Sequence, residues 1–236
     1  MEILAIAKSL TSLAPALVEQ LRQREAPAIT VTELTMNYLR TWDLVTPQQL
    51  RLEDGPTQLN ETDIRGWFVR NRAAVPAAET FLLVEVTGQT KAVTRITDLG
   101  PEVITVEDSY TGAYVLSPPA GASDVENIFF DLDKPHRGAL LDLWPEEQPP
   151  NRPYFLNRSI HLGPQESVTF VVRARTDLSK VTWRLRIAYR IGGLRERTWV
   201  SKEQWTVSSA HRVSQRLLWR WWKEPRGLIR EEDELL

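Results

Sequence analysis

The strongest candidate for catalysis in this sequence is a short acidic cluster beside a histidine. Asp131, Asp133 and His136 stand within FFDLDKPH, where the pattern predicts the end of a strand. Two carboxylates and an imidazole can bind a divalent metal ion, or can act as general acid and base. Metal hydrolases need more ligands than the chain's other two histidines can offer nearby. We therefore expect a solvated strand end here, and a hydrolase of the carbohydrate or ester class that uses such strand-end carboxylates is the alternative.

Other catalytic motifs are missing from the sequence. It contains no glycine-rich phosphate loop, no nucleophile elbow and no Ser-His-Asp order that the spacing would support. Because the chain has no cysteine, a thiolate zinc site, a disulfide framework and a cysteine nucleophile are excluded. The sequence therefore predicts no metal site and no cofactor, and it leaves catalysis uncertain while favouring a non-catalytic role.

A second chemically suggestive feature is a row of arginines on one face of a predicted sheet. Apolar and polar residues alternate over 167–200 with the two-residue period of half-buried antiparallel strands. Like charges on neighbouring strands repel, so an arginine-rich face needs an anionic partner. We expect internal carboxylates to supply it; the functional alternatives are phosphate groups of a nucleic acid or phospholipid, or an acidic protein. The candidate anion- or partner-binding residues are Arg173, Arg175, Arg184, Arg186 and Arg190.

The C-terminal segment, residues 210–236, interleaves basic residues with tryptophans. Val213, Leu217 and Trp221 recur every four residues, which predicts a basic amphipathic helix that is followed by an acidic tail. Such a helix can dock on its own domain, or it can lie on an anionic membrane with its tryptophans at the level of the headgroups. The candidate membrane- or partner-contacting residues are Trp219, Arg220, Trp221, Trp222 and Lys223.

Residues 1–25 form a second predicted amphipathic helix. Its apolar side chains fall within a sector of about 80° on a helical wheel. Leu10, Leu13 and Leu17 belong to this stripe. We expect the stripe to be covered by the chain's own domain, by another copy, by a partner helix or by a membrane surface.

The elements that must position these residues are predicted to be mainly strands. Alternation and turn signals mark about a dozen short strands between residues 29 and 208, and a short tryptophan-bearing helix is predicted over 60–72. This pattern is typical of an antiparallel β-sandwich, immunoglobulin-like or jelly-roll, with the two terminal helices attached. The predicted domains are 1–25, 26–209 and 210–236, and a break at 117–124 leaves open whether the sandwich has two sub-halves.

The order of these elements resembles that of a group of uncharacterised actinobacterial proteins. The features that carry the resemblance are the helix at 63–70, strands at 82–88 and 92–96, Phe-Phe-Asp-Leu-Asp at 129–133, and the turn at 160–167 before the strand that bears Trp183. The similarity extends over residues 57–208. It implies a β-sandwich that follows an N-terminal helical or hydrophobic segment, and it implies no activity. In this chain that segment is amphipathic rather than membrane-spanning.

Composition sets the broad class of protein. A hydrophobic content of 42% and a charged content of 25% are ordinary for a globular chain, so disorder is not expected. A net charge of -2 argues against a globally basic nucleic-acid binder. The sequence has no apolar run long enough to span a membrane, and it has no recognisable secretion signal. This predicts a cytoplasmic location, with peripheral membrane contact as an option.

The favoured function at this point is a non-catalytic interaction or scaffold module. It is expected to act through its terminal helices on a protein partner, on a second copy of itself, or on an anionic membrane surface. Nucleic-acid binding through the arginine face is a further alternative.

Overall fold

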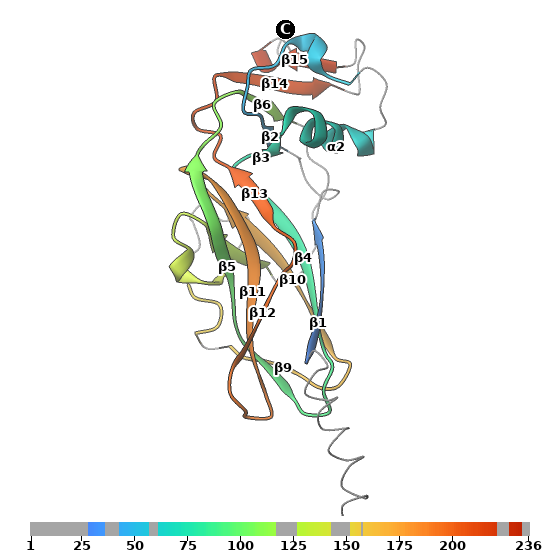
Figure 1. The fold of residues 1–236 in the computed structure, drawn as a ribbon, viewed down its shortest axis with the longest axis vertical. Helices are drawn as coiled ribbons and strands as arrows, with labels where there is room; N and C mark the ends of the chain where they lie inside the picture. Colours follow the sequence, from blue (N-terminus) through green and yellow to red (C-terminus); the bar gives the residue numbers. More distant parts are fainter. Residues whose placement is uncertain are drawn as a thin grey trace, which may run out of the picture.

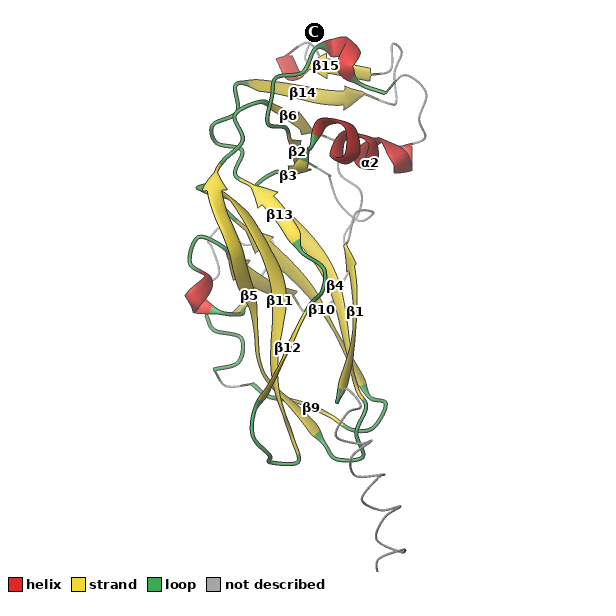
Figure 2. Ribbon diagram, in the orientation of Figure 1, coloured by secondary structure: helices red, strands yellow, loops and turns green. Residues whose placement is uncertain are grey.

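A computed structural model of the chain describes residues 28–35, 43–56, 61–116, 127–142, 152–156, 158–220 and 227–232. Over these ranges the chain is mainly β, with three mostly antiparallel sheets and one longer helix (Figures 1 and 2). The predicted mainly-β class is therefore confirmed. The predicted N-terminal helix, with Leu10, Leu13 and Leu17, and the break at 117–124 lie outside the described residues.

Sheets 1 and 2 make up the larger part of the molecule. In spatial order, sheet 1 consists of β1 (Ile29–Thr35), β4 (Glu79–Gly88), β10 (Ser167–Arg175), β7 (Asn127–Asp131) and β8 (Leu140–Leu141). Sheet 2 consists of β12 (Arg197–Val200), β11 (Ser179–Ile191), β5 (Thr94–Asp108) and β9 (Ile160–Leu162), and β13 (Trp205–Ser208) pairs with the first part of β11. The strands predicted over 167–200 are present as β10, β11 and β12, but they do not form one three-stranded meander, because β10 pairs in sheet 1 and β11 and β12 pair in sheet 2.

One hydrophobic core is shared by these two sheets. Phe170 and Val172 on β10 and Leu185 and Ile187 on β11 are fully buried in it. Trp183, also fully buried, packs edge-to-face on Phe130 with ring centroids 5.8 Å apart. The alternation of residues along β10 and β11 therefore predicted the inner face correctly.

The outer face of sheet 1 differs from the expectation of a polar surface. Phe129, Val171 and Arg173 point away from the shared core, yet they are only 4–6% exposed. Sheet 1 is thus covered on both faces in this region, and Arg173 is a buried residue rather than a surface one.

Sheet 3 and a helix form a smaller unit at one end of the molecule (Figure 1). Its strands, in spatial order, are β15 (Gly227–Arg230), β14 (Gln215–Arg220), β6 (Ala113–Leu116), β2 (Leu44–Val45) and β3 (Val75–Pro76). The helix, α2 (Glu61–Arg72), confirms the predicted tryptophan-bearing helix. A second core forms where Ile64 and Phe68 of α2 pack against Leu217 and Trp219 of β14.

The predicted C-terminal helix is wrong over the described part of 210–236. Residues 215–220 are β14 and residues 227–230 are β15. Leu217 and Trp219 face the second core, whereas Arg216 is exposed, which is the alternation of a strand. The reason is long-range pairing: β14 lies parallel to β6, about a hundred residues earlier in the chain, and this contact overrides the local helical spacing.

Two further predictions about strands are wrong. Residues 50–53, one of the short strands expected from the alternation, contain no strand, and Leu52 and Glu53 instead begin the 3-10 helix η1 (Leu52–Asp54). The two strands predicted on either side of Gly100 and Pro101 are one continuous strand, β5. A proline is tolerated there because the second neighbour of β5, β9, pairs only with Thr94–Ile96, so Pro101 lies where β5 is an edge strand.

Candidate functional site

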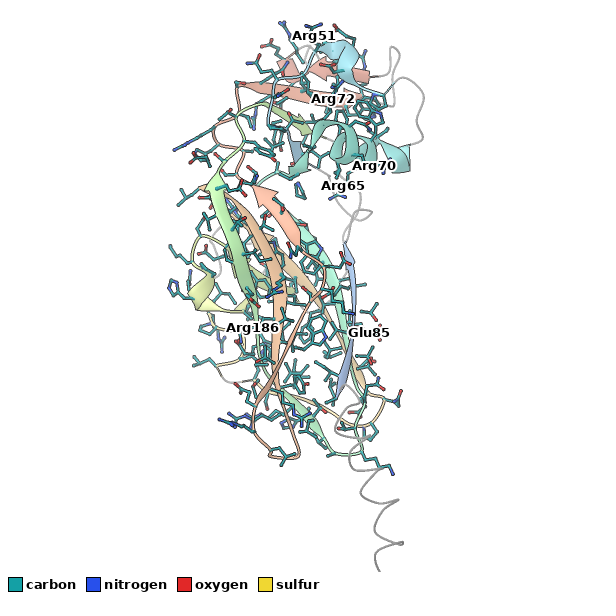
Figure 3. The ribbon with its side chains drawn as sticks, viewed as in Figure 1. Arg51, Arg65, Arg70, Arg72, Glu85 and Arg186 are labelled. Atoms are coloured by element: carbon teal, nitrogen blue, oxygen red, sulfur yellow. The ribbon has the colours of Figure 1, made fainter. Side chains whose placement is uncertain are left out.

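The arginines predicted on the sheet face pair with carboxylates of the same chain. On β11, Arg184 lies 2.7 Å from Glu102 and Arg186 lies 2.6 Å from Asp98, both on the neighbouring strand β5. Lys180 and Glu107 add a third pair at 2.8 Å. These three ion pairs between β11 and β5 are called here the ladder on sheet 2. Figure 3 labels one of its members, Arg186, in the middle of the sheet.

The other three predicted arginines also have internal partners. Arg173 makes two hydrogen bonds to Asp142 and lies 4.9 Å above the ring of Phe129. Arg175 lies 2.8 Å from Asp177, and Arg190 lies 3.4 Å from Glu196. The expected internal counter-charge is therefore confirmed for all five, and binding of an external anion by them stays a prediction.

The acidic cluster predicted as a catalytic alternative caps turns in the structure. Asp133 accepts hydrogen bonds from the Thr176 hydroxyl at 2.8 Å and from the Asp177 backbone N–H at 2.7 Å. Asp131 accepts backbone hydrogen bonds from Asp133 and Lys134, and lies 3.5 Å from Arg137. His136 is exposed in the 3-10 helix η2 (Pro135–Arg137). Within the described ranges, no group of three or more such residues could hold a metal ion.

One contact between a serine and a histidine also has a structural role. The Ser209 hydroxyl lies within hydrogen-bond distance of Nδ1 of His211, and it donates to the backbone carbonyl of Asp177 at 2.7 Å. Ser209 is only 2% exposed. A buried hydroxyl whose proton is already donated to a carbonyl is not poised as a nucleophile.

A further polar site lies on sheet 3, among residues that were not predicted as site residues. It is a shallow groove of about 630 Å³, formed where β14 begins and β15 ends. Its lining residues, called here the sheet 3 groove, are Gln49, Ser214, Gln215, Arg216, Arg230, Glu231 and Glu232. Every one of these side chains is polar or charged.

Two loosely held ion pairs distinguish the sheet 3 groove from the ladder on sheet 2. Arg216 lies 3.7 Å from Glu231, and Arg230 lies 3.7 Å from Glu232. These side chains are 41–76% exposed. Distances near 2.7 Å on sheet 2 indicate direct charge-assisted hydrogen bonds, whereas 3.7 Å exceeds that range. The guanidinium groups of the groove are therefore available for other partners.

The floor of the groove is fixed by hydrogen bonds. The side-chain amide of Gln215 accepts from the Leu50 backbone N–H at 3.0 Å and donates to the Leu50 carbonyl at 2.9 Å, as a neighbouring strand would. Gln49 donates to Ser214 at 3.1 Å. Arg216 and Arg230 thus lie beside a groove floor that these hydrogen bonds hold in place.

Tyr114 supports Arg216 from the side. The Arg216 guanidinium lies 5.1 Å from the centroid of the tyrosine ring, a cation–π distance. The Tyr114 hydroxyl donates a hydrogen bond to Asp43. Burial, and then the bond to Asp43, raise the pKa of Tyr114 far above its ordinary value, so the phenol stays protonated and the ring stays in place.

The remaining predicted site residues are distributed as follows. Trp219 is 4% exposed and packs edge-to-face on Phe68, and Arg220 is 9% exposed, so neither is a surface residue as predicted. Trp221, Trp222 and Lys223 lie outside the described residues.

Sequence reasoning missed the sheet 3 groove because its residues come from distant segments. Gln49 and Gln215 are 166 positions apart in the numbering, and they meet only because β14 joins the edge of β6. The one local signal is the alternation at 215–220, which the four-residue spacing of Val213, Leu217 and Trp221 obscured.

A scan against protein-family models and a search of curated proteins found no match to the chain. Among the described residues, no helix is both long enough and apolar enough to cross a bilayer. Function must therefore be argued from the geometry of the sites above.

Proposed function

We propose that the chain is a non-catalytic interaction or scaffold module of the β-sandwich class, which binds a protein partner at the sheet 3 groove. The observation that carries this proposal is the contrast between the ion pairs at 3.7 Å in the groove and the direct pairs near 2.7 Å on sheet 2. An open groove lined by polar and charged residues suits an extended segment of another protein better than it suits a small molecule, which needs an enclosed pocket.

The ligand would be an extended peptide segment that carries carboxylate side chains. Arg216 and Arg230 could exchange their distant glutamate partners for bidentate hydrogen bonds to such carboxylates. Glu231 is 41% exposed and Glu232 is 76% exposed, so the release of these carboxylates to water costs little. The cation–π contact with Tyr114 holds Arg216 ready for the exchange.

An array of extended peptides with systematically varied charge tests this function. The wild-type chain is expected to retain acidic peptides preferentially. The double variant Arg216→Gln, Arg230→Gln should bind these peptides at least tenfold more weakly, since hydrogen bonds to charged groups contribute about 1.5–3 kcal/mol each. The matched control is Arg184→Gln, which removes a half-buried arginine from sheet 2 and should leave binding unchanged.

Equal binding by the double variant and the wild-type chain would contradict the role of the groove. The hydrolase alternative draws no support from Asp131 and Asp133, since both cap turns. Binding of nucleic acid by the arginine face would require the pairs near 2.7 Å on sheet 2 to open first.

A further inference from the structure

Three connections meet at the end of sheets 1 and 2 that lies away from sheet 3 (Figure 1). They are the β4–β5, β9–β10 and β11–β12 connections, at 89–93, 163–166 and 192–196. The Gly192 N–H donates to the Val93 carbonyl at 3.0 Å, and the Gln165 N–H donates to the Gly88 carbonyl at 2.8 Å. These bonds join the three connections into one surface, called here the loop end.

A row of basic side chains crosses sheet 2 at the loop end. Arg95 on β5 is directly opposite Arg190 on β11 on one side and His161 on β9 on the other. All three side chains are exposed. Arg190 has Glu196 at 3.4 Å, but Arg95 has no carboxylate within ion-pair distance among the described residues. Like charges on neighbouring strands repel. Arg95 therefore lies opposite another arginine without the internal carboxylate that Arg184, Arg186 and Arg190 each have.

Further unpaired cations and two apolar side chains surround the row. Lys91 and Arg195 are exposed and form no ion pair within the part of the chain that the structure describes. Val93, whose carbonyl accepts from the Gly192 N–H, is 51% exposed, and Leu194 in the same turn as Gly192 is 62% exposed. Glu166, in the β9–β10 connection, accepts a hydrogen bond from the Gly163 N–H at 2.7 Å. The loop end is therefore basic with apolar tips.

We propose that the loop end docks on the surface of an anionic lipid bilayer. Lys91, Arg95 and Arg195 would face the acidic headgroups, while Val93 and Leu194 would enter the boundary between headgroups and acyl chains. A nucleic acid or a soluble anion would satisfy the cations but would leave the apolar tips in water. The combination of charge and apolar tips is what selects the bilayer.

The point where the described chain begins supports the same occupant. Ala28 lies at the loop end, where its carbonyl accepts a hydrogen bond from the Gln89 N–H at 3.0 Å. The residues before Ala28 in the sequence include the predicted leucine stripe of Leu10, Leu13 and Leu17. Stable attachment to a membrane takes two weak signals, and the basic loop end would be one of them.

Flotation of the full-length chain with lipid vesicles tests this inference. Binding is expected to vesicles that contain phosphatidylserine and not to vesicles of phosphatidylcholine alone. The triple variant Lys91→Gln, Arg95→Gln, Arg195→Gln should lower the partition coefficient by about a hundredfold, since each cation near an anionic surface contributes roughly a factor of five. A second variant, Leu194→Ser, tests the apolar tip and should weaken binding without changing charge.

The matched control is Arg216→Gln, Arg230→Gln, which removes two exposed arginines from sheet 3 and should bind vesicles as the wild-type chain does. Thermal unfolding of each variant shows that it is folded, and Leu194 lies in an exposed turn where a serine is tolerated. Equal partition of the triple variant and the wild-type chain would overturn the inference. Binding to phosphatidylcholine alone, or to DNA or inositol phosphates without binding to vesicles, would overturn it as well.

Discussion

Arg173 and Asp142 hold each other through two hydrogen bonds, one of 2.9 Å from Nε and one of 2.8 Å from the terminal guanidinium nitrogen. The two side chains are only 7% and 4% exposed. Glu79 lies 3.6 Å from the same guanidinium. This buried pair joins β10 to the segment just after β8, across the outer face of sheet 1.

Removing one member of this pair should destabilise the fold strongly. Arg173→Gln leaves the Asp142 carboxylate buried without its cation, and such changes cost about 3–5 kcal/mol. Urea unfolding measures the loss. In the comparison variant Arg175→Gln, the exposed pair with Asp177 is removed, and the expected loss is under about 1 kcal/mol. Similar losses in the two variants would show that burial of Arg173 is unimportant.

Glu33 should make the fold less stable as the pH rises. Its Oε1 atom is buried and has no hydrogen-bond partner among the described residues. Burial, and then the nearby charge of Glu203, raise the pKa of Glu33 from 4.5 to about 7. Because the folded chain holds this proton more tightly than the unfolded chain, the stabilisation is complete below about pH 4.5 and is lost as the pH rises through about 7.

The variant Glu33→Gln should remove this dependence on pH. At about pH 8 it is expected to be more stable than the wild-type chain by roughly 1–2 kcal/mol, a value reduced because the half-exposed carboxylate is screened by solvent. At about pH 4 the two chains should differ little. Urea unfolding at both pH values checks the difference, and a constant difference between them would refute the shift.

Asp133 is expected to contribute stability rather than activity. Its two oxygens accept hydrogen bonds from the Thr176 hydroxyl and the Asp177 N–H, so Asp133→Ala should cost about 1–3 kcal/mol. Thermal unfolding measures this cost. Replacement of the exposed His136 by alanine is the control and should be close to neutral. An unchanged melting temperature for Asp133→Ala would show that the cap does not matter.

Gly112 should tolerate no side chain, because an added Cβ would lie no more than 2.5 Å from three backbone atoms of Gln48. Gly112→Ala is therefore expected to cost about 3 kcal/mol and to disturb sheet 3, where Gly112 donates to the Thr46 carbonyl. Gly193→Ala is the contrast: its φ of +79° is strained for alanine, but the space around it is free, so about 1–2 kcal/mol is expected. Near-ultraviolet circular dichroism and thermal unfolding separate the two effects.

The sequence predicted those elements whose partners are close along the chain or whose pattern is long. Phe170, Trp183 and Ile187 were placed correctly in a core because two long strands alternate without interruption. α2 was predicted because apolar positions at helical spacing end in Arg70 and Arg72.

The errors arise where long-range pairing decides the structure. The interior position of Trp219 depends on the pairing of β14 with β6, which no local pattern records. Likewise, the charge of Arg173 predicts an exposed position, and nothing local in the sequence shows that the outer face of sheet 1 is covered. The sheet 3 groove could not be predicted for the same reason, because Gln49 and Arg216 come to line one groove only in the folded chain.

The position of β14 in sheet 3 also bears on how the chain is made. β14 lies between β6 and β15, and it supplies Leu217 and Trp219 to the core that Ile64 and Phe68 of α2 share. During translation α2 leaves the ribosome well before β14 is synthesised, so the part of its apolar face that Leu217 and Trp219 cover stays exposed while the intervening chain is made. The nascent chain should therefore depend on chaperones in this interval, and a ribosome stalled before residue 215 would display a client for them.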